Sequence, residues 1–144
     1  MNIEKLFKKQ GYIIVKNENN KYIDSIERDI LNVFKTKNNL QDIHHNFNHK
    51  HINNYRLKAF SKINSQKNWD LSYYKICKSS LDRLIGQDLS IQTKLNLSIQ
   101  MPHDKTSKLS LHTDTLSGQS EFEIVVWTPI TNAYKSNSMY IFDI

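Results

Sequence analysis

The residues best suited to chemistry are His112 and Asp114, in the run Leu-Ser-Leu-His-Thr-Asp-Thr at 109–115. Strand side chains alternate between two faces, so residues two apart at a strand end put an imidazole and a carboxylate on the same side. A His-x-Asp pair supplies two of the three ligands of the 2-His-1-carboxylate triad that holds Fe(II) in non-haem oxygenases. The pattern therefore predicts His112 and Asp114 as metal ligands and requires a third ligand elsewhere.

Other residues of the right type are weaker candidates for that third ligand. His103 lies in the loop before the motif, where a solvated histidine is the expected role, and Asp143 is expected to be a turn or edge residue. A group of four histidines resembles a metal cluster by type, but its spacing does not match a structural zinc site and no cysteine accompanies it. These residues are His44, His45, His49 and His51, within a polar stretch that we interpret as a loop.

The first part of the chain has helical periodicity. Apolar residues recur at three- and four-residue spacing over about 20–36, which predicts an amphipathic helix. Shorter helices are predicted over 2–9, ending at Gly11, and over 51–64. A third long apolar stripe predicts one helix over 68–85, with Asn68 as its cap.

After Gly86 the pattern changes to alternation. Leu95, Leu97, Ile99 and Met101 alternate with polar residues, which is typical of a strand with one buried face. We predict strands over 94–101, 109–112, 121–128 and 137–143, and an earlier short strand over 12–15. Helices followed by an antiparallel β run predict an α+β architecture.

Three single residues have both a functional and a packing interpretation. Gln100, on the polar face of the first long strand, is a candidate for contacting a ligand, with a solvent-facing side chain as the alternative. Trp127 could line a pocket for a sugar but more often such a residue is part of the core. Cys77 lies in a helical apolar stripe and is expected to pack there.

Composition gives few further constraints on partners. The formal net charge is +6, but the basic residues are scattered and no basic stripe or stacking motif accompanies them. We attribute the charge to a compositional bias rather than to nucleic-acid binding. Mean hydropathy is −0.62 and no apolar run reaches the roughly 18 residues of a membrane helix. The N-terminus has no apolar signal core, and a lone cysteine fits a reducing compartment. We therefore expect a soluble, cytoplasmic protein.

Three stretches of the second part resemble a known enzyme family. They are Leu-Asn-Leu-Ser-Ile-Gln-Met-Pro from 95, Leu-His-Thr-Asp-Thr-Leu-Ser-Gly-Gln-Ser-Glu-Phe-Glu-Ile-Val-Val-Trp-Thr-Pro-Ile from 111 and Tyr-Lys-Ser-Asn-Ser-Met-Tyr-Ile from 134. Together they resemble the 2-oxoglutarate/Fe(II) oxygenases of sporadic carbohydrate-biosynthesis clusters, which are relatives of the phytanoyl-CoA dioxygenases. The resemblance is dense over about 95–143.

The resemblance implies Fe(II) and 2-oxoglutarate as cofactors, a sugar or nucleotide-sugar as substrate, and helices packed on a double-stranded β-helix (jelly-roll). It places the first two metal ligands at His112 and Asp114 and makes Gln100 a candidate contact of the co-substrate, and the family's distal His and Arg would follow residue 144. We therefore expect residues 1–144 to form one incomplete oxygenase domain, helical over 1–90 and β over 91–144, that is inactive alone and open to association through exposed sheet edges. The alternative is a non-catalytic remnant that serves as a binding or interaction module.

Overall fold

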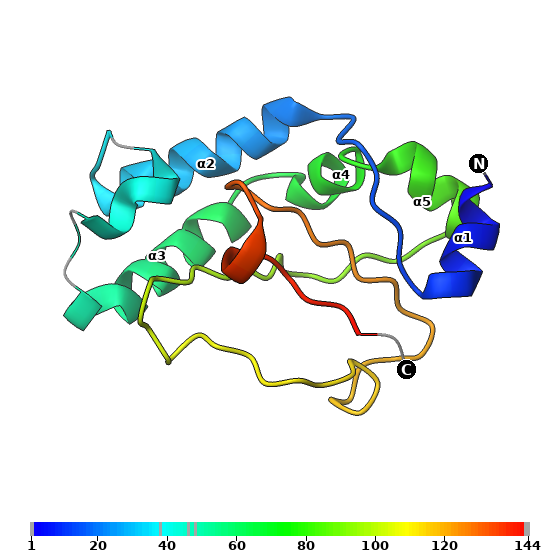
Figure 1. The fold of residues 1–144 in the computed structure, drawn as a ribbon. Helices are drawn as coiled ribbons and strands as arrows, with labels where there is room; N and C mark the ends of the chain where they lie inside the picture. Colours follow the sequence, from blue (N-terminus) through cyan, green and yellow to red (C-terminus); the bar gives the residue numbers. More distant parts are fainter. Residues whose placement is uncertain (1, 38, 46, 48, 143–144) are drawn as a thin grey trace.

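Five α-helices form the framework of the described part of the chain. The structure is a computed structural model that describes residues 2–37, 39–45, 47 and 49–142. The helices are α1 (Ile3–Gln10), α2 (Asn20–Phe34), α3 (Ile52–Asn64), α4 (Trp69–Tyr74) and α5 (Lys78–Ile85), with short 3-10 helices η1 (Leu40–His45), η2 (His49–His51) and η3 (Lys135–Asn137). All five α-helices lie before residue 86, and the later part of the chain runs beneath them in extended segments (Figure 1).

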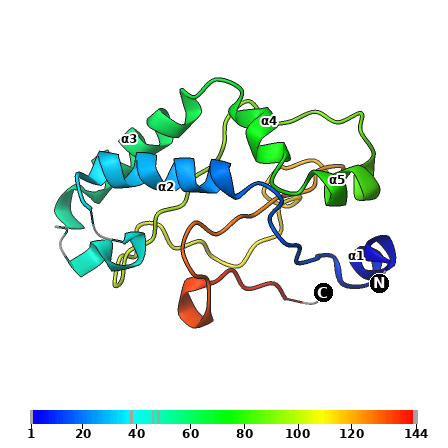
Figure 2. The ribbon, with the colours of Figure 1, turned by 90° about the horizontal axis from the view of Figure 1, so that it is seen from above.

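The core lies where α2 and α3 pack against each other in opposite directions (Figures 1 and 2). Every fourth residue of α2 from Tyr22 to Phe34 is buried, because residues four apart share one face of a helix. On α3 the buried residues are Ile52, Ala59 and Ile63. The helix predicted over 20–36 is therefore confirmed, and it ends at Phe34.

Aromatic rings join the far end of this helix pair. The Phe34 ring lies 5.0 Å from the Phe47 ring and 5.1 Å from the Tyr55 ring, measured between centroids. Phe47 and Tyr55 also meet edge to face at 4.6 Å. Such aromatic pairs add to the stabilisation that burial alone provides. They connect the C-terminal end of α2, the segment after η1 and the first turns of α3.

At the other end of the molecule, α1 packs beside α5 (Figure 1). The Asn2 side chain caps α1 by accepting hydrogen bonds from the backbone N–H groups of Glu4 and Lys5. Gly11 ends the helix with φ at 75°, a left-handed conformation that glycine adopts without strain. The prediction of a short helix stopped by Gly11 is confirmed.

The single helix predicted over 68–85 is instead two helices, α4 and α5. Ile76 and Cys77 follow each other at the break and are both buried, at 1% and 5% exposure. The break is held from a distant part of the chain. The Glu18 N–H donates to Ile76 O at 2.7 Å, and the Glu18 carboxylate accepts from the Ser79 N–H in the first turn of α5. Asn68 occupies the cap position of α4, but its side chain makes no capping hydrogen bond.

The predicted α+β jelly-roll is wrong. Among the described residues no β-strand forms, either over 12–15 or in any of the four later segments; residue 143 of the last one lies outside the described residues. A strand requires a neighbouring strand to pair its backbone groups, and the extended segments contribute no such ladder to the described part of the chain. The second part of the protein is therefore extended but not a sheet.

Helix side chains hold these extended segments in place of a ladder. The Asn64 amide pairs with both backbone groups of Leu95, accepting from its N–H at 2.7 Å and donating to its carbonyl at 3.0 Å. Arg56 Nε donates to Ile99 O at 2.8 Å, and Tyr73 Oη donates to Val126 O at 2.9 Å. We call Asn64, Arg56 and Tyr73 the side-chain anchors. They satisfy backbone groups that a sheet would otherwise pair.

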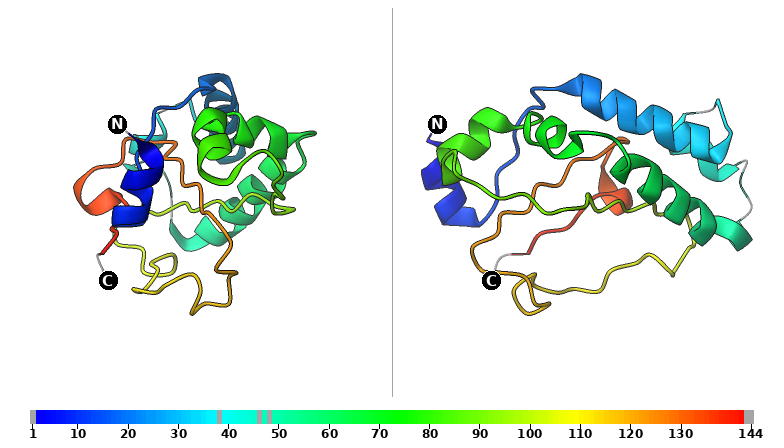
Figure 3. Two further views of the ribbon diagram at one scale, coloured as in Figure 1. Left: turned by 90° about the vertical axis from the view of Figure 1, so that its right-hand side faces the viewer. Right: turned by 180° about the vertical axis from the view of Figure 1, so that it is seen from behind.

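The predicted alternation of side chains is nevertheless present. Leu95 and Met101 are buried at 6% exposure, and Leu97 and Ile99 between them are half-buried. The intervening Asn96, Ser98 and Gln100 are exposed. The apolar face thus packs on the helices and the polar face points away. Figure 3 shows the backbone of this segment passing beside α3. The sequence pattern indicated the correct face of this segment.

One buried polar atom of the core has no partner. Among the described residues, Tyr22 Oη is buried without a hydrogen bond. Burial, with the nearby Tyr73, Asp70 and Asp29, raises the pKa of Tyr22 to about 12. Tyr22 therefore stays a neutral phenol at physiological pH, and its ring lies 6.4 Å from that of Tyr73.

The helices found are all short or polar for a membrane span. Within the described residues, none has the length and apolar character needed to cross a bilayer.

Candidate metal centre

The side chains of His112 and Asp114 converge. His112 Nε2 lies 3.5 Å from Asp114 Oδ1, and the two side chains are 38% and 53% exposed. The segment around them is neither the predicted strand nor a helix. The pair predicted from the sequence is therefore brought together, although no strand positions it.

A compact turn after His112 fixes the position of Asp114. Asp114 O accepts from the N–H groups of Ser117 and Gln119, both at 3.0 Å. Gly118 completes the turn with φ at 93°, a conformation that strains residues with a Cβ. The backbone of Asp114 is thus held by this turn, and Gly118 makes the turn favourable.

His112 is oriented by its other ring nitrogen. Nδ1 lies 2.7 Å from the backbone oxygen of Ser110. A carbonyl oxygen can only accept, so Nδ1 carries the proton and Nε2 of the neutral ring has a free lone pair. Metal-binding histidines are commonly oriented by a hydrogen bond of this kind. The tautomer that would bind a metal through Nε2 is therefore the one that this contact favours.

The geometry fits two adjacent positions around a metal ion. With bonds of about 2.0–2.2 Å to nitrogen and oxygen, two ligands at a right angle lie about 3 Å apart. The observed 3.5 Å is close to that separation, and both side chains are exposed enough to adjust. The residues present therefore fit a divalent cation, with its remaining positions open.

No third His, Cys, Asp or Glu joins the pair in the described part of the chain. No group of three or more His, Cys, Asp or Glu residues there could hold a metal. His103 is an exposed loop residue with φ at 62° and is not part of such a group. The rings of His44 and His45 lie 3.9 Å apart, but they too form no such group. The side chain of His49 and Asp143 lie outside the described residues.

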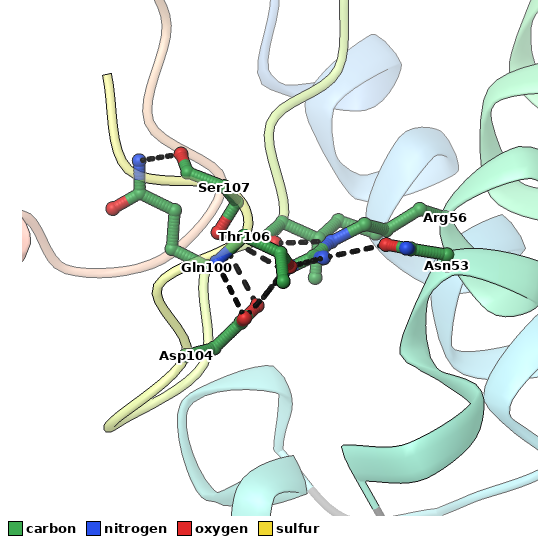
Figure 4. Close-up of polar contacts among 7 residues, drawn as sticks. Asn53, Arg56, Gln100, Asp104, Thr106 and Ser107 are labelled. Atoms are coloured by element: carbon green, nitrogen blue, oxygen red, sulfur yellow. Dashed lines mark hydrogen bonds and ion pairs between the residues drawn. The ribbon is translucent and has the colours of Figure 1, made fainter. Parts of the chain in front are cut away.

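Gln100 is placed beside a different polar cluster. Its side-chain nitrogen donates to Ser107 O at 3.4 Å, close to the ion pair of Arg56 and Asp104 (Figure 4). Gln100 is exposed, as the alternative interpretation of its polar face expected. Its role as a co-substrate contact stays a prediction. Cys77 is buried, so packing accounts for this residue. Trp127 is 47% exposed.

Arg56 is a residue that sequence reasoning missed. Every nitrogen of its guanidinium donates a hydrogen bond, and it pairs with the Asp104 carboxylate (Figure 4). Its other partners are Ile99 O at 2.8 Å, Asn53 Oδ1 at 2.9 Å, Thr106 Oγ1 at 3.0 Å and Ser107 Oγ at 3.0 Å. With its donors occupied in this way, Arg56 fastens the loop after Met101 to α3 and has no donor left for a ligand.

Asp104 makes the loop side of this contact. Its Oδ1 accepts from the Thr106 N–H at 2.9 Å and from the Thr106 hydroxyl at 2.7 Å. An aspartate that bonds to the backbone two residues later forms an Asx turn, so the Asp-Lys-Thr order was a usable signal in the sequence. The hydrogen bonds from Thr106 and from Arg56 hold the pKa of Asp104 well below its usual range.

The lowered pKa of Asp104 predicts a specific acid sensitivity. An unfolded aspartate titrates near pH 3.9, so this carboxylate contributes stability that is present above about pH 4 and is lost as the pH falls through the lower pKa of the folded protein. We expect the urea midpoint to fall less steeply below about pH 4 in Asp104→Asn than in the wild type. The same change at the exposed Asp88 serves as control, and equal slopes in all three proteins would contradict the prediction.

Comparison with protein-family models, with curated proteins and with solved structures finds no match to this chain. The resemblance to the 2-oxoglutarate/Fe(II) oxygenases therefore stays a prediction from the sequence.

Proposed function

We propose that His112 and Asp114 hold a ferrous ion and that this chain is part of a 2-oxoglutarate-dependent oxygenase acting on a sugar or nucleotide-sugar. The single observation that supports this most is the convergence of His112 Nε2 and Asp114 Oδ1 at 3.5 Å, with Nδ1 engaged by Ser110 O. The sequence resemblance supplies the identity of the metal and the co-substrate. The proposal does not depend on a jelly-roll.

The two residues have distinct roles. Neutral His112 would bind through Nε2, oriented by the Ser110 carbonyl, and Asp114 would bind through a carboxylate oxygen and reduce the charge of a divalent ion to +1. That remaining charge suits a dianionic 2-oxoacid. When bound, ferrous iron with 2-oxoglutarate would activate O₂ for oxidation of a substrate carbon. Two protein ligands hold a metal weakly, so we expect no turnover from this chain alone.

A second candidate is a binding or interaction module without catalysis. It is favoured by one observation, the lack of a third ligand beside the pair in the described part of the chain. The two functions differ in one measurable respect. An oxygenase site should bind metal more tightly when 2-oxoglutarate is present, because a chelating 2-oxoacid fills open positions, whereas a module of this kind has no reason to respond.

The test is an anaerobic Fe(II) titration followed by calorimetry and by NMR of the histidine rings. We expect weak binding with little preference among Fe(II), Mn(II) and Co(II), strengthened by 2-oxoglutarate. His112→Asn and Asp114→Asn should each abolish the response. His103→Asn makes the same change at an exposed loop histidine and should preserve the response, because asparagine tolerates the left-handed backbone conformation of residue 103.

Two outcomes would count against the proposal. If the His112 ring signals do not respond to Fe(II) with 2-oxoglutarate present, the metal site is refuted. If the chain binds one equivalent of Fe(II) tightly without 2-oxoglutarate, then the site has more protein ligands than His112 and Asp114.

A further inference from the structure

Residues 123–127 follow an extended course (Figure 1) and carry alternating exposure. Ile124 and Val126 are half-buried against the body of the protein, and Glu123, Val125 and Trp127 point outward. Val125 is 64% exposed and Trp127 47%. The run begins after a turn at Ser120, whose carbonyl accepts from the Glu123 N–H, and Pro129 follows it without an N–H to donate. It therefore has the conformation and the length of a short edge strand.

One edge of this run is occupied and the other is open. Tyr73 Oη donates to Val126 O. Successive residues of a strand point their backbone N–H and C=O groups to opposite edges, so residues 124 and 126 share the edge that Tyr73 occupies. Within the described part of the chain, the backbone groups of Val125 and Trp127 have no hydrogen-bond partner. The edge opposite Tyr73 thus presents unpaired donors and acceptors.

This edge lacks the lysine side chains that usually protect an edge against pairing. Natural edge strands commonly carry lysine, which discourages a second strand from adding. This chain has 20 Lys and Arg residues, but none lies between Lys108 and Lys135. The outward side chains at the centre of the run are instead valine and tryptophan, which favour cross-strand contact.

We propose that residues 123–127 pair with the same residues of a second copy of this chain, antiparallel and centred on Val125. The open edge then forms two hydrogen bonds between the Val125 residues and two from Trp127 N–H groups to Glu123 carbonyls, while Tyr73 keeps the opposite edge in each copy. This pairing is two-fold symmetric, so it closes as a dimer.

Charge selects the antiparallel arrangement. Centred on Val125, the pairing sets Glu123 opposite Trp127, so no two carboxylates face each other. A parallel, in-register pairing would place the two Glu123 side chains directly opposite, which is unfavourable for like charges. The run is therefore complementary to itself in one direction only.

Sedimentation of the whole chain over a roughly hundredfold range of concentration tests the proposal. We expect a monomer–dimer equilibrium whose dissociation constant rises roughly tenfold or more in Val125→Lys, because two lysines would then meet at the symmetry axis. Ile14→Lys makes the same kind of change at an exposed residue of the segment between α1 and α2 and should leave the equilibrium unchanged.

A cross-linking experiment tests the direction of pairing. The Val125→Cys variant should form an intermolecular disulfide with diamide as the oxidant, because opposite residues of a hydrogen-bonded pair lie about 5.5 Å apart, which a disulfide can span. The Glu123→Cys variant should not, because the two copies of that residue would be about 14 Å apart. The native Cys77 is buried and serves as the background.

Each contrary result overturns the proposal. A monomer at all concentrations, association that Ile14→Lys weakens as much as Val125→Lys, or polydisperse aggregates in place of a dimer would exclude closed pairing at residues 123–127. Cross-linking at both 123 and 125 would show a parallel arrangement instead.

Discussion

Replacing Ile63 by Ala is expected to lower the free energy of unfolding by about 3–4 kcal/mol. Ile63 is 0% exposed and belongs to the buried cluster that also contains residues of α2 and Leu95. Truncation of such a residue removes buried apolar surface and leaves a cavity. The surrounding helices are held by several other buried side chains and can collapse only partly into that space. The effect is measured by urea unfolding followed through tryptophan fluorescence, to which the buried Trp69 contributes.

The matched control is Ile14→Ala. Ile14 is 90% exposed, so losing the same atoms there should change the free energy of unfolding by less than about 0.5 kcal/mol. A loss below about 1 kcal/mol for Ile63→Ala would mean that the α2–α3 contact is not the core of this protein.

Replacing Asn64 by Ala is expected to cost about 2–3 kcal/mol, although the residue is polar and only half-buried. Its amide pairs with both backbone groups of Leu95, a residue that is 6% exposed. Without the amide, a buried N–H and a buried carbonyl lose their partners, and an unsatisfied buried group costs more than an ordinary hydrogen bond contributes. Hydrogen exchange gives a local readout: the Leu95 amide should lose its protection while the amides of α3 keep theirs.

Asn53→Ala provides the comparison on the same helix. Asn53 is exposed and its side chain accepts one hydrogen bond, from Arg56 Nη1. That substitution should cost well under half as much and leave Leu95 protected. If the two variants were equally stable, Asn64 would not be an anchor of the extended segment.

The helices were predictable because their signal is local. In α2, the spacing of Tyr22, Ile26 and Ile30 specifies both the helix and its buried face. The break between α4 and α5 was not predictable, since it depends on Glu18, which is far away in the sequence. A periodic pattern gives the conformation of a segment, but contacts from other segments decide where it is interrupted.

The same distinction explains the error in the fold class. Alternation at Leu95–Met101 reports which side of an extended segment is buried, and that side was predicted correctly. Whether such a segment becomes a strand depends on a second segment at the right distance and register. The alternation of one segment contains no information about its neighbour, so the jelly-roll rested on the family resemblance.

For the candidate site, the sequence predicted the pair but not its support. His112 and Asp114 were expected on one side of a strand, and they do converge, but through a turn closed by Gly118. Arg56 carried no signal at all, because a basic residue on a helix is usually solvated. Its hydrogen bonds to the loop depend on the approach of residues 99–107, more than forty positions later in the chain.

The side-chain anchors contact main-chain atoms, which every residue type shares. Asn64, Arg56 and Tyr73 would hold positions 95, 99 and 126 equally well if Leu, Ile or Val there were exchanged for one another. Substitution of one apolar residue by another at these three positions should therefore be tolerated. Substitution of the side-chain anchors themselves should not. In related chains, variable apolar residues at the held positions together with invariant anchor residues would therefore reveal this mode of attachment from the sequences alone.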